Sequence, residues 1–236
     1  MRVLITGATT SLGQALSDGL APAHLLRLSD RDGLETQREF VPSELGHDES
    51  TGALVEDIEA IVHLAYAPRP GDSETEWLDH NSRRTYNLLW AAAEAGVKHV
   101  VVVSTLDLFA PYDSHLTVSE NWKPLPSCDP AILGAHLCEF TAREFAHSRA
   151  LPVTVVRLGH LVHAEEVEGQ SYDPVWVDID DAVRAIGNIL DKITAERDRP
   201  YGVVHIQSDS PRARFSVAAA KSRLEFAPEQ NFEANP

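Results

Sequence analysis

The stretch RVLITGATTSLGQAL, residues 2–16, contains an apolar strand, a short loop with glycines at 7 and 13, and the start of a helix. Such a turn presents backbone N–H groups and the positive end of a helix dipole to a bound phosphate. Dinucleotide loops usually carry a further glycine between these two, and here that position is Thr10, whose side chain can crowd a pyrophosphate. We predict a nucleotide site at Thr6, Gly7, Thr10, Ser11, Leu12 and Gly13.

Short apolar runs alternate with helical patterns along the first two-thirds of the chain. The runs are residues 2–8, 24–30, 59–67, 99–105 and 152–159, with a weaker one at 38–45, and the helical patterns cover 11–20, 81–95 and 131–148. Compact runs rich in Val, Ile and Leu are typical of strands buried on both faces of a parallel sheet. We predict an α/β fold with a Rossmann-type doubly wound parallel sheet.

The domain organisation is predicted as one compact unit with two parts. Residues 1–159 form the dinucleotide-binding Rossmann domain, and residues 160–236 form a reduced substrate-binding lobe with C-terminal elements. The later part loosens into a polar loop at 163–174, followed by a helix at 180–192, a strand at 201–209 and a helix at 215–224.

Composition excludes several functional classes. The formal charge of −16 argues against a nucleic-acid partner, because an acidic surface repels phosphate backbones. No run approaches the ~18 apolar residues of a membrane helix, and the N-terminus lacks a signal-peptide pattern, so a cytoplasmic location is expected. Cys128 and Cys138 are too few for a disulfide framework and are interpreted as reduced thiols.

Asp30 ends the second apolar run, roughly twenty residues after the glycine loop. A carboxylate there accepts the ribose hydroxyls of NAD and repels the 2′-phosphate of NADP, which favours NAD. Arg27 and Arg31 flank it and leave NADP open, and a simple turn at Asp30 is the other reading.

Longer segments carry a family resemblance. DIEAIVHLAYAP (57–68), NSRRTYNLLWAAAEAGVKHVVVVST (81–105), VTVVRLGHLV (153–162) and VDIDDAVRAI (177–186) resemble the extended short-chain dehydrogenase/reductase family, the NAD-dependent epimerase/dehydratase group. The resemblance covers nearly the whole chain and implies an NAD(P)-binding protein with a sugar-like ligand, most similar to the compact sugar-acid dehydrogenases. It also implies that Leu64, Ala65 and Tyr66 line the cofactor groove.

The family's catalytic residues are matched only in part. Thr105 falls on the catalytic hydroxyl, with Ser104 as the fallback, although either hydroxyl could instead satisfy backbone groups. The family pattern P-Y-G-x-S-K-L-x-x-E aligns with PAILGAHLCE (130–139), which puts Ala131 on the tyrosine and Ala135 on the lysine. A register shifted by one residue brings His136 to the lysine position and still supplies no tyrosine. The standard proton relay is therefore predicted to be absent.

Other residues are weaker substitutes. Tyr112, Tyr172 and His136 are each considered as a proton donor, and His160 and His163 with Glu165 and Glu166 as metal ligands, although no third placed ligand is found and no metal is predicted.

Two functional classes stay open: an oxidoreductase acting on a sugar-like carbonyl or alcohol, or a non-catalytic sensor of NAD(H) or a sugar ligand that acts as a regulatory or scaffold partner. If Thr10 abolishes cofactor binding, a structural partner remains. The resemblance also implies a homodimer through the helices at 81–95 and 131–148, whose apolar positions are Leu88, Leu89, Leu133, Leu137 and Phe140.

Overall fold

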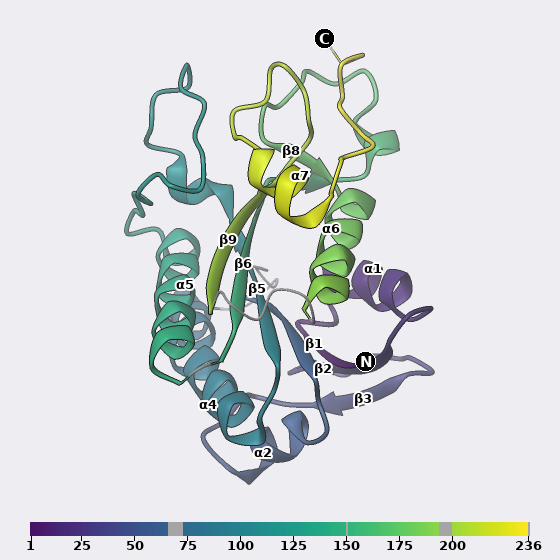
Figure 1. The fold of residues 1–236 in the computed structure, drawn as a ribbon, viewed down its shortest axis with the longest axis vertical. Helices are drawn as coiled ribbons and strands as arrows, with labels where there is room; N and C mark the ends of the chain where they lie inside the picture. Colours follow the sequence, from purple (N-terminus) through teal and green to yellow (C-terminus); the bar gives the residue numbers. More distant parts are fainter. Residues whose placement is uncertain (66–72, 150, 194–199, 236) are drawn as a thin grey trace.

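The computed structural model describes residues 1–65, 73–149, 151–193 and 200–235, and its centre is a sheet of seven parallel strands (Figure 1). The strands are β1 (Arg2–Thr6), β2 (Leu25–Asp30), β3 (Glu39–Pro42), β4 (Ala60–Leu64), β5 (His99–Thr105), β6 (Val153–Leu158) and β9 (Tyr201–Ile206). Their order is β3-β2-β1-β4-β5-β6-β9, so the chain winds outward in one direction and returns through β4 to the other edge. The doubly wound α/β fold is confirmed, with the change of direction between β1 and β4.

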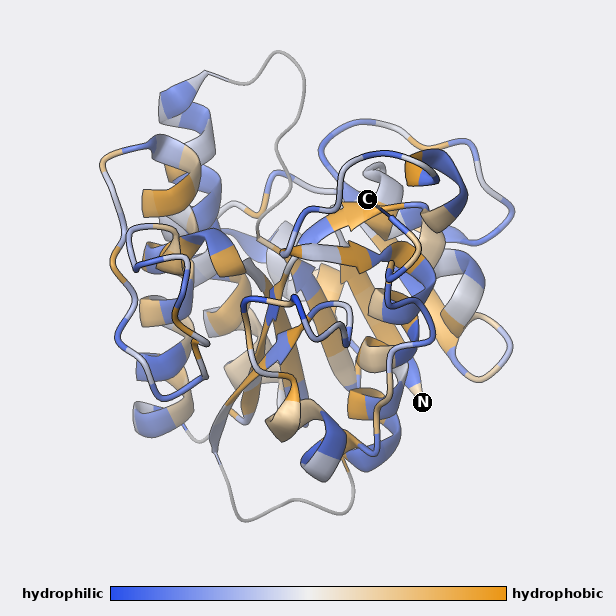
Figure 2. Cartoon of the chain, turned by 90° about the horizontal axis from the view of Figure 1, so that it is seen from above, coloured by the Kyte–Doolittle hydropathy of each residue, from blue (hydrophilic) through white to orange (hydrophobic). Residues whose placement is uncertain are grey.

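Helices cover both faces of the sheet. One face packs against α1 (Ser11–Leu20), α6 (Ile179–Lys192) and α7 (Ala218–Leu224), and the other against α2 (Glu49–Val55), α4 (Thr85–Ala95) and α5 (Pro130–Ser148). Every residue of β4 is buried as a result, which explains why His63 is its one polar residue. Figure 2 shows apolar strands enclosed by helices with polar outer faces.

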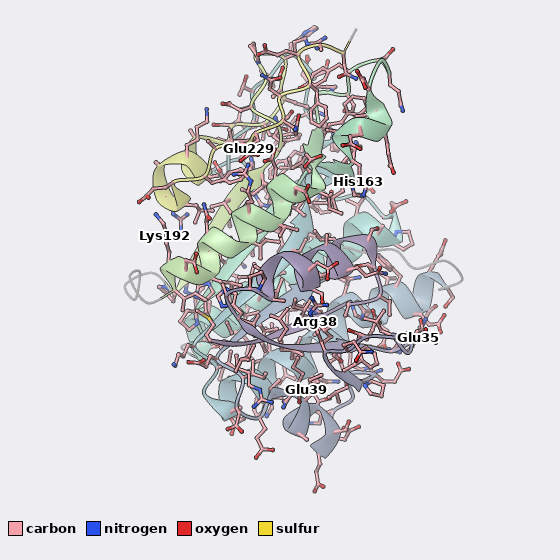
Figure 3. All side chains as sticks on the ribbon, turned by 90° about the vertical axis from the view of Figure 1, so that its right-hand side faces the viewer. Glu35, Arg38, Glu39, His163, Lys192 and Glu229 are labelled. Carbon is pink, nitrogen blue, oxygen red and sulfur yellow. The ribbon has the colours of Figure 1, made fainter. Side chains whose placement is uncertain are left out.

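The pair α1 and α6 lies side by side on one face of the molecule (Figure 3). A methyl group added at Gly19 would lie 2.5 Å from Cγ1 of Val183, so this position needs glycine for the two helices to approach. Lys192 at the end of α6 pairs with Glu225 just beyond α7, at 2.8 Å. Residues of α1, α6 and α7 also share one apolar core, which holds the C-terminal helices on the same face of the sheet as α1.

The segment after β6 forms a small addition and then returns to the main sheet. β7 (His160–Val162) and β8 (Trp176–Asp178) pair in parallel, and a short 3-10 turn, Ala164–Val167, lies between them. β9 then joins β6 as the seventh strand. Within the described residues, no helix is long and apolar enough to cross a membrane.

The predicted helix at 81–95 differs from the observed one. The helical segment begins earlier, with α3 (Glu74–Asp79), continues through a π-helical turn (His80–Arg84) and ends with α4. Ser73 and Glu76 form a capping box at its start, a signal that the polar sequence before residue 81 contains. The last helix also begins later than predicted, at Ala218, because Ser216 and Val217 belong to the preceding loop.

Candidate functional site

The glycine loop follows β1 and lies against the end of β4. Gly7 has a φ of +76°, and a Cβ there would lie 2.9 Å from the Cβ of Leu64. A Cβ at Gly13 would lie 2.3 Å from the carbonyl oxygen of Gly7. Both glycines are therefore required by backbone conformation and close approach, as expected for a loop that lets a pyrophosphate reach the helix N-terminus.

Thr10 caps helix α1 in the place of the missing glycine. Its hydroxyl donates to the carbonyl oxygen of Gly7 at 2.7 Å and accepts the N–H of Gly13 at 3.1 Å. Helix geometry leaves the N–H groups of Ser11 and Leu12 without intrahelical partners. The helix end thus keeps two donors and its dipole for an anion, while the third donor is taken by Thr10.

Asp30 is buried at the carboxyl end of β2 and faces the glycine loop. Its Oδ2 accepts the backbone N–H and the hydroxyl of Thr9 at 3.0 and 2.6 Å, and its Oδ1 accepts the N–H of Arg31 at 2.7 Å. Gly7 and Asp30 line a narrow pocket, and Arg31 borders the same pocket. Arg27 does not, because its guanidinium binds Glu39 at 2.8 Å and backbone carbonyls at the end of α2.

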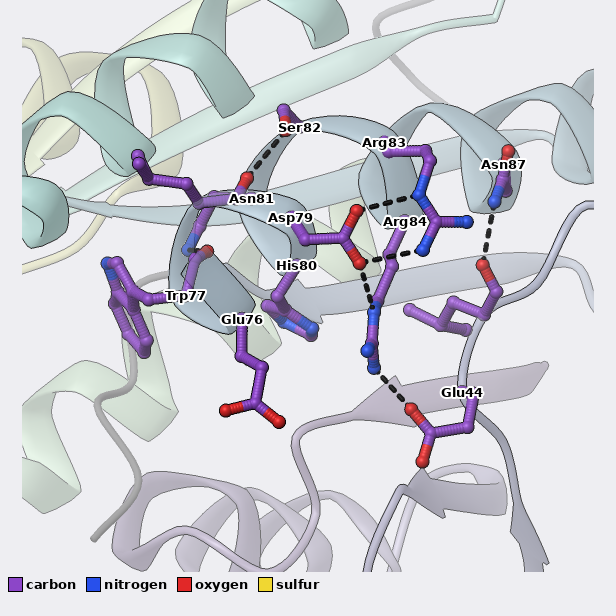
Figure 4. A network of polar contacts seen from close by, with 12 residues as sticks. Glu44, Glu76, Trp77, Asp79, His80, Asn81, Ser82, Arg83, Arg84 and Asn87 are labelled. Carbon is purple, nitrogen blue, oxygen red and sulfur yellow. Dashed lines mark hydrogen bonds and ion pairs between the residues drawn. The ribbon is translucent and has the colours of Figure 1, made fainter. Parts of the chain in front are cut away.

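The π-helical turn places charged side chains at this pocket (Figure 4). Arg84 donates to Asp79 at 2.9 Å and also binds Glu44, which follows β3, while Arg83 donates to Asp79 at 2.6 Å. The turn adds one residue to the helical repeat and presents the two arginines to one carboxylate. Sequence reasoning missed this network, because Glu44 and Arg84 are 40 positions apart.

Thr6 borders the pocket and also forms a hydrogen bond in the core. Its hydroxyl lies 2.7 Å from Nδ1 of His63, whose Nε2 lies 3.0 Å from the hydroxyl of Thr85. Burial lowers the pKa of His63 to about 3, so the ring is neutral. Leu64 and Ala65 are buried at the end of β4 beside the glycine loop. Tyr66, predicted to line the groove, lies outside the described residues.

The two hydroxyls at the end of β5 have different surroundings. Thr105 donates to Oδ2 of Asp107 at 3.1 Å and accepts the N–H of Asp107 at 3.1 Å. Ser104 lies in register with Arg157 on β6, which lies in register with His205 on β9. The Ser104 hydroxyl is buried without a hydrogen-bond partner among the described residues. Of the two hydroxyls, that of Thr105 is the one with hydrogen-bond partners in the described part of the chain.

Of the two alanines predicted at the tyrosine and lysine positions, Ala131 is half-buried and Ala135 lies in closed surroundings. Ala135 is fully buried in an apolar cluster with residues of the β5–α5 connection, including Phe109, and with Phe215. One turn further, Glu139 holds Arg157 through two hydrogen bonds of 2.9 and 2.8 Å, with both side chains 5% exposed. His136, the shifted-register alternative, is half-buried, and its Nδ1 has no partner among the described residues.

Tyr112 and Tyr172, the tyrosines considered as alternative proton donors, both contact residues of the surrounding loops. The hydroxyl of Tyr112 donates to the carbonyl oxygen of Lys123 at 2.9 Å, and its ring packs edge-on against Trp122. The ring of Tyr172 packs against Trp176 and lies 4.2 Å from the guanidinium carbon of Arg212. In the described part of the chain, neither phenol is hydrogen-bonded to Thr105.

His160 joins the Thr105 hydroxyl to the small C-terminal addition. Its Nε2 lies 2.9 Å from Oδ1 of Asp107, and its Nδ1 lies 2.8 Å from Oδ2 of Asp173. Hydrogen bonding to Asp107, reinforced by Asp173, raises the pKa of His160 to about 9, so the ring is an imidazolium at neutral pH. His160 was considered with His163 only as a metal ligand. Among the described residues, no group of three or more histidine, cysteine or carboxylate side chains is arranged so that it could hold a metal ion.

Comparison with known proteins identifies the family. The model of the NAD dependent epimerase/dehydratase family matches residues 3–173, which include the glycine loop, Asp30, Thr105 and His160. The chain belongs to this family. The predicted resemblance is confirmed, and so is the similarity to sugar-acid dehydrogenases.

Two relatives align over almost the entire chain. The NAD-dependent glucose-6-phosphate dehydrogenase of Haloferax volcanii is 24% identical over 259 residues, covering 99% of this chain and 97% of the relative. The uronate dehydrogenase of Pseudomonas syringae pv. tomato is 25% identical over 239 residues, covering 98% of this chain and 83% of the relative.

Solved structures share the fold. A tyrosine-to-alanine mutant of uronate dehydrogenase from Agrobacterium tumefaciens, complexed with NAD, superposes with a TM-score of 0.84 at 25% identity, covering 99% of this chain and 86% of the other. UDP-N-acetylglucosamine 4-epimerase from Bacillus cereus superposes with a TM-score of 0.78 at 20% identity, covering 98% and 95%. The whole chain therefore has the architecture of these enzymes.

Proposed function

We propose that the chain binds NAD along the carboxyl edge of the sheet. The observation that carries this proposal is the glycine loop, where Gly7 and Gly13 leave no room for a Cβ. The N–H groups of Ser11 and Leu12 would hold the pyrophosphate, and Asp30 would lie at the adenosine ribose. Asp30 favours NAD over NADP, because its carboxylate repels a 2′-phosphate, whereas Glu44 at the same pocket is paired with Arg84.

We further propose that the reaction is the oxidation or reduction of a sugar-like alcohol or carbonyl. The named relatives are dehydrogenases of a sugar acid and a sugar phosphate, which supports this substrate class. NAD supplies the hydride chemistry. Thr105 would contact the reacting oxygen of the substrate, because it offers a connected hydroxyl at the end of β5.

The test begins with the cofactor. At a free NAD concentration of 100 times the Kd, binding adds about 2.7 kcal/mol of stability. Titration with NAD should therefore raise the melting temperature. NADP should have a smaller effect at equal concentration. Turnover of sugar acids and sugar phosphates is then measured for the wild type and for Thr105→Ala. Absence of any shift with either cofactor refutes the binding proposal, and unchanged turnover in Thr105→Ala removes that hydroxyl from the mechanism.

A non-catalytic sensor of NAD(H) or of a sugar ligand is the second candidate. The burial of Ala135 in an apolar cluster favours it, because no amine is present at the family's lysine position. A relative, the tyrosine-to-alanine mutant of uronate dehydrogenase, was solved in complex with NAD. This supports the idea that NAD can bind when a tyrosine has been replaced by alanine. A sensor binds NAD and a sugar ligand with coupled affinities and produces no NADH, which distinguishes it from the oxidoreductase.

We propose that the chain forms a homodimer through α4 and α5. Leu88 and Leu89 are fully buried in the core, so they contribute nothing to a second subunit. Tyr86 and Phe140 are instead 43% and 50% exposed and border one hollow with Trp90 between α4 and α5. Exposed aromatic side chains gathered in one hollow are typical of protein interfaces.

A further inference from the structure

Asp107, His160 and Asp173 form a connected polar cluster next to Thr105. The cluster joins three separate segments: the turn after β5, the start of β7 and the loop before β8. Both ring nitrogens of His160 donate to carboxylates, and the second oxygen of Asp107 accepts the Thr105 hydroxyl. Both ring nitrogens can donate at once only in the imidazolium form, which supplies one N–H to each carboxylate.

We propose that His160 is a positioning residue that fixes Asp107 against Thr105, so that Thr105 and Asp107 handle the substrate proton in place of the family's tyrosine and lysine. This inference rests on the proposed oxidoreductase function. Because Asp107 accepts the Thr105 proton, a lone pair of the Thr105 hydroxyl is available to the substrate. His160 adds a contact from a distant segment of the chain to the local contacts that orient Asp107 at Thr105.

The proton can be followed in the direction of alcohol oxidation. Bound NAD⁺ would accept the hydride from the substrate carbon, and the substrate hydroxyl proton would pass to Oγ1 of Thr105. The original proton of Thr105 passes to Oδ2 of Asp107, and the substrate C=O bond forms. Asp107 is 25% exposed and returns the proton to water. The net products are a carbonyl compound, NADH and one proton.

Solvent contact and charge fit this role. The His160 side chain is 46% exposed and that of Asp173 is 33% exposed, so the cluster lies at the rim while Thr105 is buried. Asp107 and Asp173 are the charged groups that act on His160 among the described residues. The imidazolium of His160 lies between the two carboxylates and offsets one of their two negative charges.

The first test needs no activity. Histidine-selective NMR of the wild type, assigned with His160→Ala, should show His160 protonated until about pH 9, and Asp173→Asn should lower that midpoint. A midpoint in the wild type near the ordinary value of 6.5 would mean that the cluster does not form, and the proposal is then overturned.

The second test is kinetic. His160→Ala should reduce kcat by about 10²-fold, since small misplacements near reacting atoms have effects of that size. KM and the NAD affinity should stay unchanged, and the alkaline limb of the pH profile near 9 should disappear. His160→Gln, which retains an N–H donor, should recover part of kcat. His163→Ala is the matched control, because His163 lies just beyond the end of β7. This variant should behave as the wild type.

The outcomes separate the two proposals. Wild-type turnover with an unchanged kcat and pH profile in His160→Ala overturns the role of His160 and leaves the oxidoreductase function standing. NAD binding without wild-type turnover on any sugar acid or sugar phosphate overturns the oxidoreductase function and this role together.

Discussion

Introducing lysine at position 135 tests whether the family's lysine position is closed to solvent in this chain. Ala135 is fully buried among apolar side chains, and Glu139, one helical turn away, is already paired with Arg157. Ala135→Lys therefore places an amine where it meets no free carboxylate. We expect the lysine to lose its proton on folding, because burial in apolar surroundings disfavours the charged form.

The magnitude follows from the pKa of lysine. Buried lysines have pKa values about 3–5 units below the ordinary value of about 10.4. Deprotonation at pH 7 then costs about 1.4 kcal/mol for each unit between 7 and 10.4, or roughly 4.6 kcal/mol, and roughly 1.9 kcal/mol at pH 9. The added side-chain volume costs a further ~1–3 kcal/mol, which does not depend on pH.

The sign of the pH dependence follows from proton binding. Between the lowered folded pKa and about 10.4, the unfolded chain binds the proton and the folded chain does not, so stability rises with pH. Urea denaturation of the variant should give a free energy of unfolding about 2.7 kcal/mol higher at pH 9 than at pH 7, after subtraction of the wild-type change. Ala135→Met is the control for volume and should lack this difference. A lysine variant as stable as the methionine variant at both pH values would refute the reasoning, because it would place position 135 in an open, polar groove.

Three further predictions concern the loop, the core and the surface. Gly13→Ala should lose ~1–3 kcal/mol of stability and NAD binding, whereas Gly33→Ala, with no atom within 4 Å of the added carbon, should keep both in melting and titration experiments. Arg157→Met should cost ~3–5 kcal/mol in urea denaturation by leaving Glu139 buried and unpaired, and adding Glu139→Leu should recover most of it; equal losses in both variants would contradict this. Phe140→Glu should shift the mass measured by light scattering from dimer to monomer, and an unchanged dimer would exclude the α4–α5 hollow as the interface.

Local sequence signals predicted the parts of the site that a single turn of chain contains. Gly7 and Gly13 are needed where a strand, a tight turn and a helix follow one another within the loop itself. The family resemblance pointed to Thr105, and the distance from the glycine loop pointed to Asp30. The sequence did not distinguish Arg27 from Arg31, because the orientation of a strand-end side chain depends on which helix covers that face.

Sequence alone determined the alternation of strands and helices, the position of the glycine loop and the absence of tyrosine and lysine at positions 131 and 135, since each depends on residue type and short spacing. Only the tertiary structure decided that Ala135 is enclosed by apolar side chains, that Arg84 reaches Glu44, and that His160 binds Asp107 and Asp173. The physical reason is that a parallel sheet brings the carboxyl ends of its strands to one edge. The residues that meet there are 13 to 53 positions apart in the His160 cluster, and no local pattern records their contact.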